Sequence, residues 1–526
     1  MAKLYNSLGR QIQEIIPIKD NQIGLYTCGP TVYWYAHIGN LRTYVFQDIL
    51  KRVLEYDGFK VKHVMNITDV GHLTSDADQG EDKLEKGAAR ENKTVWEIAQ
   101  FYTDAFLKDI DRLNIIRPDI LVKATDTIQE QIDLIKELEA KGFTYQIADG
   151  IYFDTSKLPS YGALWPNKME LKAGARVEMA EGKKNATDFA LWKFSPQDSK
   201  RQMEWESPWG IGFPGWHTEC VVMAGMHLGI PFDIHCGGID HVLIHHTNEI
   251  AQSEAAYGKI PANFWMHGEF MMIDPLGSIS LKNNSHICPH CGYENILKSK
   301  NDYILENDAD GILLMVECQN PECRKKFSGM IKISKSKGNI ILIDNIIAKG
   351  INPLAFRYLC LTTHYRQKMN FSWEALEGAS NALKSIYEKI QEYQKAGIAD
   401  LSSQAQEFKQ KFNDIVNEDL NMPQTIALVW DLLKSDLSDS DKYSLLLDFD
   451  KILGLDFAKI QGTAQTTQEM FDAMMDEEDK NTYLEYKKAK LEKNYTKSDE
   501  LRKKLIEKGF TVRDRKDGAV DLTKGF

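Results

Sequence analysis

Four side chains that lie far apart in the sequence combine the atom types that bind Zn²⁺: Cys28, Cys220, His245 and Glu249. His245 and Glu249 are four residues apart, so on a helix both side chains project from the same face. This pairing is typical of helical zinc sites, in which two further ligands complete a tetrahedron. The surrounding stretch, 233–249, is polar where the junction of a core strand with a helix is normally apolar. These residues predict a metal centre, with Cys28 and Cys220 as candidates for the remaining ligands.

A second set of cysteines has the spacing of a zinc ribbon: Cys288, Cys291, Cys318 and Cys323. The two pairs read C-x₂-C and C-x₄-C, are separated by 26 residues, and carry Pro and Gly at the knuckles. A closed set of four thiolates leaves no position open for a substrate. We therefore expect a structural Zn²⁺ here rather than a second reaction centre, and the eight cysteines of the chain are too sparse for a disulfide scaffold.

Phosphate binding is predicted at residues 28–40, which follow an apolar strand candidate at 23–27 and open a helix candidate. The helix is indicated by apolar side chains at helical spacing: Val45, Phe46, Ile49, Leu50, Val53 and Leu54. A strand, a Gly/Pro turn and a helix start form a mononucleotide-binding half of an α/β sheet, with helix amides available for phosphate. Residues 60–69 predict a second buried strand in βαβ order. ATP is therefore expected at this turn, with Thr68 at the binding edge of the sheet.

The composition is that of a soluble globular protein with two or three domains, since the 526 residues are 43% hydrophobic and 27% charged. No apolar run approaches the ~18 residues of a membrane span, and the first residues resemble no secretory or transit segment, so we expect a cytoplasmic protein without a membrane partner. The formal charge of −12 argues against a general nucleic-acid coat protein. Residues 483–526, with 13 Lys and Arg against 8 Asp and Glu, nevertheless predict a local basic face.

The sequence H-I-G-N at 37–40 resembles the first signature of class I aminoacyl-tRNA synthetases, and C-G-P-T-V-Y at 28–33 resembles the cysteinyl-tRNA synthetase family within that class. The resemblance covers nearly the whole chain apart from the four-cysteine segment. It implies that Cys28, Cys220, His245 and Glu249 hold an active-site Zn²⁺, that Gly29, Thr68, Trp216 and Asp240 bind substrate, and that His37, Gly39 and Asn40 bind ATP, with His37 and Asn40 also catalytic. In this family Trp216 would form a wall of the amino-acid pocket and Asp240 would receive the ammonium group.

Three features depart from the family pattern. Cys236 stands where Gly is usual, and Thr247 stands where Glu is frequent. The second class signature appears as Lys332-Ile333-Ser334-Lys335-Ser336, in which Ile replaces the usual Met. This exchange conserves volume, so we expect the loop to keep its function.

The resemblance implies that Lys332 and Lys335 act in catalysis on the charge that develops as pyrophosphate leaves, that Lys335 also binds ATP, and that Mg²⁺ accompanies ATP. In the family, the strand expected at 267–274 runs almost directly into this signature. Here 57 residues separate Asp274 from Lys332, and they contain the four cysteines. We expect this ribbon to restrain the lysine loop or to contact the acceptor arm of the tRNA.

The chain is predicted to be an α/β protein: a doubly wound, Rossmann-like parallel-sheet catalytic domain with an inserted connective subdomain and a zinc ribbon, followed by an α-helical C-terminal region. The expected boundaries are the first half of the catalytic domain at 1–142, the connective peptide at 143–198, the second half at 199–280, the ribbon at 281–330, the lysine loop and stem-contact region at 331–370, a helical tRNA-binding bundle at 371–460 and a basic anticodon-binding segment at 483–526. Within them we expect a strand at 150–153, mostly helices over 76–142, and helices from about 218 and from Pro353.

The resemblance implies a ligase that activates L-cysteine with ATP to cysteinyl-adenylate and transfers it to the 3′ end of tRNA(Cys), with zinc selecting the thiol. Its expected partners are tRNA(Cys), L-cysteine and ATP, and the chain is expected to be a monomer. Two other functions stay open. A ligase that joins cysteine to a small amine would keep the metal site and both phosphate motifs but lack the helical, basic C-terminus. A catalytically silent RNA-binding or regulatory paralogue would have lost a signature lysine or a zinc ligand, and all of these are present.

Overall fold

The computed structural model divides the chain into two compact units, each built from separate stretches of sequence. The first comprises Met1–Asp274, Leu359–Ser372 and Ala396–Leu455, and the second comprises Pro275–Tyr358, Trp373–Lys395 and Asp456–Phe526. The described residues are 1–71, 82–165, 182–196, 201–273, 285–288, 291, 293–296, 303–308, 311–328, 341–460, 477–492, 494–507, 510–514 and 520–524. Within these ranges, no helix combines the length and the hydrophobicity that a membrane span requires.

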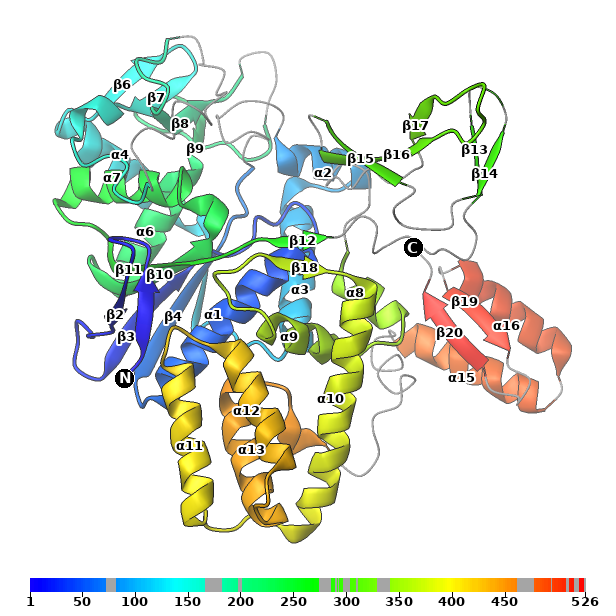
Figure 1. Cartoon of the computed structure of the whole chain (residues 1–526). Helices are drawn as coiled ribbons and strands as arrows, with labels where there is room; N and C mark the ends of the chain where they lie inside the picture. The colour runs from blue at the N-terminus through cyan, green and yellow to red at the C-terminus, as the bar shows by residue number, and fades with distance from the viewer. Residues whose placement is uncertain are drawn as a thin grey trace. The chain divides into compact units, whose positions relative to one another are not determined.

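A five-stranded parallel sheet forms the centre of the first unit (Figure 1). Its strands, in spatial order, are β11 (Ala262–Gly268), β10 (Phe232–Gly238), β3 (Gln22–Thr27), β4 (Lys60–Ile67) and β5 (Ile120–Lys123). The chain proceeds from β3 to β5 in one direction and from β10 to β11 in the other, so a topological switch lies between β3 and β10. Open α/β sheets bind ligands at the carboxyl ends of the strands beside such a switch. The predicted α/β fold and its βαβ order are confirmed.

Helices lie between these strands along the chain. They are α1 (Ile38–Tyr56), α2 (Lys83–Glu91), α3 (Val95–Arg112), α4 (Ile128–Ala140), α6 (Trp216–Leu228) and α7 (His245–Tyr257). α1 connects β3 to β4, and α7 connects β10 to β11. Because these two right-handed crossovers run in opposite directions along the sheet, α1 and α7 cover opposite faces. All six apolar side chains that predict α1 are buried.

An antiparallel sheet of four strands follows α4. Its strands are β6 (Thr144–Ile147), β7 (Gly150–Phe153), β8 (Phe189–Phe194) and β9 (Gly212–Pro214). The buried carboxylate of Asp188 joins three segments, because it accepts hydrogen bonds from the Thr155 amide at 2.9 Å, the Tyr145 hydroxyl at 2.7 Å and the Asn185 amide at 2.9 Å. This one side chain therefore links the segments around β6, β7 and β8.

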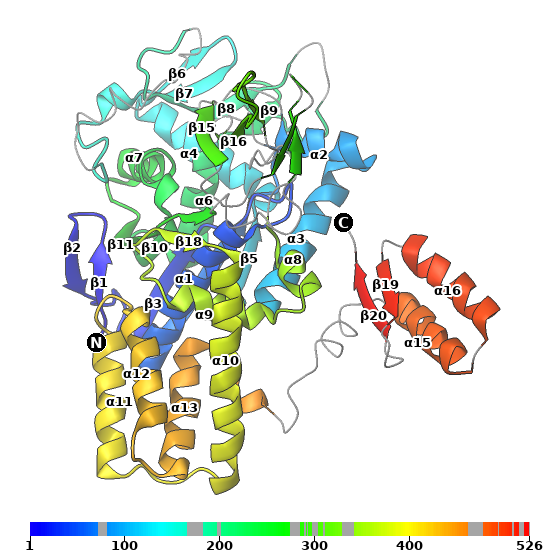
Figure 2. The ribbon, with the colours of Figure 1, turned by 45° about the vertical axis from the view of Figure 1, so that its right-hand side comes forward.

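Three helices from the last part of the first unit lie side by side (Figures 1 and 2): α11 (Ser403–Val416), α12 (Met422–Lys434) and α13 (Asp439–Leu453). Each begins at a capping side chain, Ser402, Asn421 or Ser438, that accepts a hydrogen bond from a first-turn backbone amide. The rings of Phe412 and Phe449 stack with their centroids 3.9 Å apart. The predicted helical C-terminal region is confirmed.

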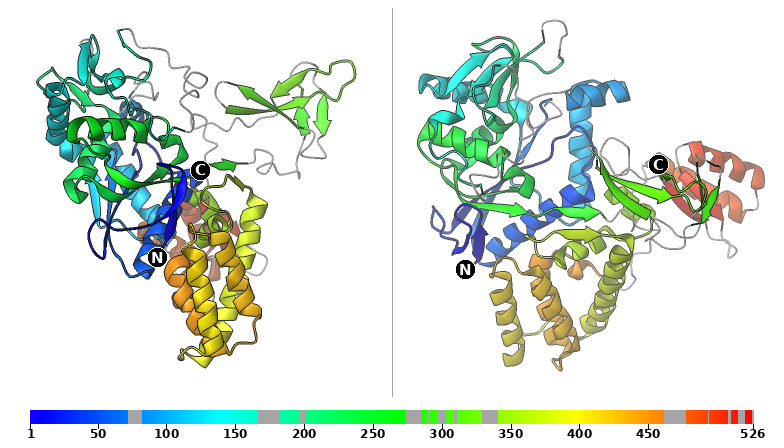
Figure 3. Two further views of the ribbon diagram at one scale, coloured as in Figure 1. Left: turned by 60° about the vertical axis from the view of Figure 1, so that its left-hand side comes forward. Right: turned by 45° about the horizontal axis from the view of Figure 1, so that its top comes forward.

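Within the described residues, the second unit holds short strands, one short α-helix and three longer α-helices. Its elements are β13 (Ser285–Ile287), β14 (Glu294–Ile296), β15 (Tyr303–Asp308), β16 (Gly311–Glu317), β17 (Lys326–Ser328), α8 (Ile343–Ala348), α10 (Trp373–Tyr393), α15 (Glu477–Leu491), α16 (Tyr495–Glu507), β19 (Phe510–Asp514) and β20 (Val520–Lys524), while α9 (Pro353–Leu361) crosses the boundary between the units. α16 packs on α15 and on the hairpin of β19 and β20 (Figure 3, red).

The structure differs from the prediction at 267–274, for which the sequence indicates one strand. β11 ends at Gly268, and a separate strand, β12 (Met271–Ile273), pairs in parallel with β18 (Met369–Phe371). The strand is interrupted because the carbonyl oxygens of Glu269 and Phe270 accept hydrogen bonds from the Arg42 side chain. At the N-terminus, β1 (Lys3–Asn6) and β2 (Gln11–Glu14) form an antiparallel pair.

His63 on β4 makes the stability of this core depend on pH. Its Nε2 lies 2.8 Å from Thr27 Oγ1. Burial and the Lys51 ammonium lower the pKa of His63 to about 3, although the carboxylates of Asp119 and Asp48 act in the opposite direction. Because this value is below the unfolded pKa of about 6.5, the stabilisation by the neutral ring is complete above pH 6.5 and declines as the pH falls toward 3.

We expect the free energy of unfolding of the wild type, measured relative to a His63→Gln variant, to fall by about 2 kcal/mol between pH 6.5 and pH 5. Glutamine can retain a hydrogen bond to Thr27 but does not titrate. Urea unfolding of both proteins at the two pH values gives this difference. A difference that stays constant over the interval would show that the ring is not held neutral.

Candidate metal and substrate site

The four predicted metal ligands converge at the carboxyl edge of the sheet, beside the switch between β3 and β10. Cys28 follows β3, Cys220 lies on α6, and His245 and Glu249 lie one turn apart at the start of α7. Their ligand atoms, one from each residue, all lie within 4.8 Å of one another. The structure therefore brings together side chains that the sequence spreads over more than 200 positions.

The donor atoms of this cluster are arranged around a common centre. Cys220 Sγ and Glu249 Oε1 lie 3.4 Å and 2.9 Å from the same atom, His245 Nε2. Glu249 Oε1 is paired with His245 by charge, but the two atoms are not aligned as a regular hydrogen bond. This geometry is expected when several lone pairs face one cation, and two thiolates, an imidazole and a carboxylate form a donor set that suits tetrahedral Zn²⁺. Cys28 is 6% exposed and the other three are 1–2% exposed, so the centre is shielded from bulk water.

The pKa values within the cluster reflect close opposite charges. Burial raises the pKa of Cys220, but the hydrogen bond with Cys28 and the nearby His245 lower it to about 7. Burial lowers the pKa of His245, yet Glu249 and Cys220 raise it to about 10. Burial likewise opposes ionisation of Glu249, but His235 and His245 hold its pKa well below its usual range. The cluster therefore favours a positive charge at its centre.

Three further histidines surround the predicted ligands, and the sequence reasoning missed them. His235 Nε2 lies 2.6 Å from Glu249 Oε2, and His246 Nε2 lies 3.2 Å from Cys28 Sγ. His246 Nδ1 in turn lies 2.8 Å from His267 Nε2. His235, His246, Cys28 and Glu249 also form a second group whose ligand atoms lie within 4.8 Å. The signal that could have found His235 is the polar character of a buried strand end.

The residues of the first signature form the start of α1. His37 is the N-cap residue, and its Nδ1 accepts a hydrogen bond from the Asn40 amide at 3.2 Å. Asn40 Oδ1 accepts one from the His37 amide at 3.3 Å, which completes a reciprocal capping box. A Cβ on Gly39 would lie 3.0 Å from the His37 ring. The signature thus sets the geometry of this helix start, while Lys332 and Lys335 lie outside the described residues.

The four predicted substrate-binding residues differ in their exposure. The Trp216 ring lies over His245 with centroids 4.2 Å apart, and Asp240 is exposed in the short turn after β10. Gly29 lies against β4, where a Cβ would come within 1.7 Å of the Asn66 carbonyl oxygen. Thr68 is only 1% exposed, and its hydroxyl donates a hydrogen bond to Glu219 Oε2 at 3.0 Å. Asp240 is therefore open to solvent and Trp216 partly so, whereas the Thr68 side chain is enclosed.

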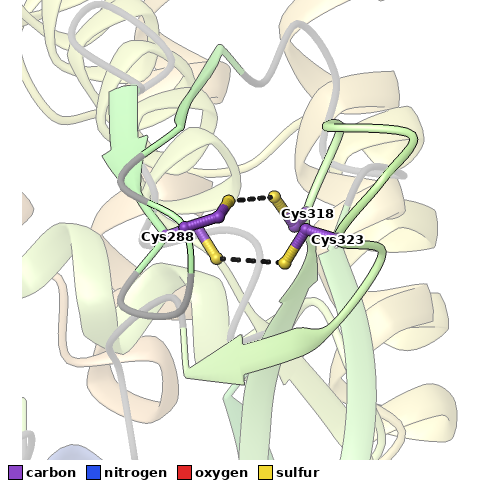
Figure 4. A group of neighbouring side chains, drawn as sticks. Cys288, Cys318 and Cys323 are labelled. Atoms are coloured by element: carbon purple, nitrogen blue, oxygen red, sulfur yellow. Dashed lines mark hydrogen bonds between the residues drawn. The ribbon is translucent and has the colours of Figure 1, made fainter.

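The second cysteine set also converges (Figure 4). Cys288 Sγ lies 3.9 Å from Cys323 Sγ, and Cys291 Sγ lies 3.6 Å from Cys318 Sγ. Ligand atoms of all four residues lie within 4.8 Å of one another. The loops are shaped by backbone hydrogen bonds, among them those from the Cys288 amide to Tyr293 O and from the Cys318 amide to Lys325 O. Four thiols at these distances suit a closed, tetrahedral zinc site.

Comparison with known proteins gives consistent results. Residues 14–293 match the family model described as the catalytic domain of class I (C) tRNA synthetases. The chain is 42% identical to cysteine–tRNA ligase 1 of Burkholderia lata, over 98% of this chain and 95% of that protein. It is 39% identical to the cysteine–tRNA ligase of Treponema denticola, over 98% of each. The methionyl-tRNA synthetase of Mycobacterium tuberculosis, solved with methionyl-adenylate, shares the fold with a TM-score of 0.51 and 13% identity, over 85% of this chain and 96% of that one.

Proposed function

The chain belongs to the cysteine–tRNA ligase family of class I aminoacyl-tRNA synthetases, and we propose that it performs the family reaction with the residues predicted above. L-cysteine and ATP form cysteinyl-adenylate and pyrophosphate, and the cysteinyl group then passes to the 3′-terminal ribose of tRNA(Cys). The observation that carries this proposal is the buried set Cys28, Cys220, His245 and Glu249 at the binding edge of the sheet.

Cysteine recognition is assigned to this set together with Trp216 and Asp240. When bound, Zn²⁺ supplies a Lewis-acid site that holds a thiolate far better than a hydroxyl, and so separates cysteine from serine. The Trp216 ring, which lies against His245, covers the thiol end of the pocket and excludes water. The exposed carboxylate of Asp240 receives the ammonium group, which leaves the cysteine carboxylate facing the nucleotide.

Adenylation is assigned to the two signatures. The first-turn amides of α1 face the phosphates with the positive end of the helix dipole, and His37 and Asn40 hold this turn and contact ATP. An oxygen of the cysteine carboxylate attacks the α-phosphorus, and the bond from phosphorus to the bridging oxygen breaks as pyrophosphate leaves. Mg²⁺, when bound with ATP, would supply positive charge to the phosphates. Lys332 and Lys335 stabilise the charge on the leaving group, so catalysis consists mainly of positioning and charge stabilisation.

Transfer to tRNA requires surfaces beyond the catalytic fold. We assign anticodon binding to residues 483–526, because this segment has an excess of basic residues in an otherwise acidic chain. In the predicted stem-contact region, Arg366 Nε donates a hydrogen bond to Asp419 Oδ2 at 2.7 Å, and His364 Nε2 lies 2.9 Å from the Asp419 carbonyl oxygen. These two side chains therefore help to hold the region in shape. We further propose that the protein acts as a monomer in the cytoplasm.

The four-cysteine group is assigned a structural Zn²⁺. Cys288, Cys291, Cys318 and Cys323 fill all four positions of a tetrahedral ion, which leaves none for a substrate. Metal binding of this kind supplies folding energy to a segment built from short strands. Its proposed role is to restrain the lysine loop or to contact the acceptor arm.

The test of this function is ATP–pyrophosphate exchange with cysteine and with serine as parallel substrates, followed by aminoacylation of tRNA(Cys). We expect exchange with cysteine to exceed exchange with serine by about 10⁴-fold, because a site built around one specific contact rejects the analogue that cannot make it. Transfer to tRNA excludes the alternative of a small amine as acceptor. A folded, zinc-loaded protein that shows no exchange would contradict the proposal and favour the catalytically silent paralogue.

A further inference from the structure

A chain of hydrogen bonds, the first partly buried and the other two buried, connects the two segments that carry Cys28 and Cys220. The Gly29 amide donates to Asn66 Oδ1 at 2.8 Å, Asn66 Nδ2 donates to Thr68 Oγ1 at 3.0 Å, and the Thr68 hydroxyl donates to Glu219 Oε2 at 3.0 Å. Asn66, Thr68 and Glu219 are 2%, 1% and 0% exposed, respectively. Water therefore has little access to these bonds, and in such surroundings a hydrogen bond is electrostatically strong.

The direction of every bond in this chain is determined. The Gly29 amide can only donate, so it requires the oxygen of the Asn66 side chain and turns the Asn66 nitrogen toward Thr68. Thr68 Oγ1 accepts that bond, and the single proton of its hydroxyl is then directed to the carboxylate of Glu219. Reversing any one bond would leave a buried donor facing a donor. The arrangement is therefore a fixed connector rather than a set of interchangeable contacts.

The ends of this connector adjoin the two cysteines. Gly29 directly follows Cys28, and Glu219 directly precedes Cys220 on α6. The absence of a side chain at Gly29 allows its backbone to approach β4, where a Cβ would come within 1.7 Å of the Asn66 carbonyl oxygen. The connector thus spans from the loop after β3, across the end of β4, to the helix that carries the second thiol.

We propose that Asn66, Thr68 and Glu219 are positioning residues that brace the metal site by fixing the separation of Cys28 and Cys220. The proposal rests on the proposed function, in which these two thiolates hold Zn²⁺. The backbone of Thr68 separately holds the loop after Cys28, since its amide donates to Pro30 O at 3.1 Å and its carbonyl accepts from the Val32 amide at 3.2 Å. The Thr68 hydroxyl adds the link to α6. This link holds the Cys220 thiolate in position before the metal binds.

The test replaces Thr68 by valine, which has nearly the same shape, lacks the hydroxyl and leaves both backbone bonds in place. We expect the affinity of the active-site zinc, measured by competition with a chelator in the full-length protein, to fall by about 10- to 100-fold, as is typical when a hydrogen-bonded support of a metal ligand is removed. Thr68→Ser keeps the hydroxyl and is expected to restore the affinity. The matched control is Thr103→Val, because Thr103 is an equally buried threonine whose hydroxyl donates to Ala99 O at 2.7 Å on α3.

Cobalt substitution gives a second readout, independent of activity. The thiolate-to-cobalt charge-transfer band that disappears in a Cys220→Ala variant reports this site alone, and we expect Thr68→Val to weaken or shift it at equal thermal stability. The proposed positioning role would be overturned if Thr68→Val left the zinc affinity unchanged. It would also be overturned if Thr68→Ser bound zinc as weakly as Thr68→Val. If the Cys220→Ala variant had the same metal content and cobalt spectrum as the wild type, the proposed metal site itself would be overturned. The two failures are therefore distinguishable.

Discussion

Replacing Cys220 by alanine is expected to lower cysteine-dependent ATP–pyrophosphate exchange by roughly 10⁴-fold and to reduce the zinc content from two ions per chain to one. The substitution removes a ligand that is 1% exposed and lies 3.4 Å from His245 Nε2. The remaining three residues can bind metal only weakly, and the substrate thiol then loses the contact that selects it. Metal analysis of the purified protein and exchange assays with cysteine and serine measure both effects.

Two other cysteines supply the controls for this experiment. Cys360 is buried but belongs to neither cysteine cluster, so Cys360→Ala is expected to retain two zinc ions and normal exchange. Cys318→Ala is expected to lose the ribbon zinc while the enzyme still prefers cysteine to serine. If Cys220→Ala kept both ions and its exchange activity, the assignment of the active-site metal would be wrong.

Part of the chemistry of this site follows from residue type and local spacing, while the place of Cys28 and Cys220 in it follows from the resemblance to the family. The i, i+4 spacing of His245 and Glu249 predicts their common face on α7, and the structure confirms it. The turn that starts α1 follows in the same way from an apolar strand, a Gly/Pro turn and apolar residues at helical spacing. Such signals are short-range, so one sequence suffices to read them.

The support of the site could not be predicted, because it depends on contacts between distant segments. Thr68 was expected at the sheet edge and does lie there, but its hydroxyl bonds to Glu219, 151 residues away in the sequence. His235 and His246 likewise acquire their roles only when β10 and α7 bring them against Glu249 and Cys28. No pattern in one sequence specifies which buried polar residues will meet. Only the three-dimensional packing decides how each is satisfied.

Arg42 illustrates the same limit, because within the described residues its four hydrogen-bond acceptors are all backbone oxygens. It lies on the second turn of α1 and is 4% exposed. Its Nη1 donates to the carbonyl oxygens of Glu269 at 2.8 Å and Phe270 at 2.7 Å. Its Nη2 donates to those of His364 at 3.2 Å and Gln367 at 2.6 Å. A planar guanidinium is suited to bridge two chain segments in this way, and it joins the helix of the first signature to the approaches of β12 and β18.

Replacing Arg42 by methionine is therefore expected to lower the free energy of unfolding by roughly 4 kcal/mol, since several buried carbonyl groups lose a charged donor and each unsatisfied group costs ~1–3 kcal/mol. Arg42→Lys is expected to recover only part of this loss, because an ammonium cannot reproduce the planar fork. The control is Arg117→Met, which breaks an exposed ion pair with Asp111 and is expected to cost less than about 1 kcal/mol. Urea unfolding of the wild type and the three variants measures these differences in the free energy of unfolding. If Arg42→Met lowered the free energy of unfolding no more than Arg117→Met does, the four hydrogen bonds of Arg42 would not contribute to stability. Other contacts would then have to hold the pairing of β12 with β18.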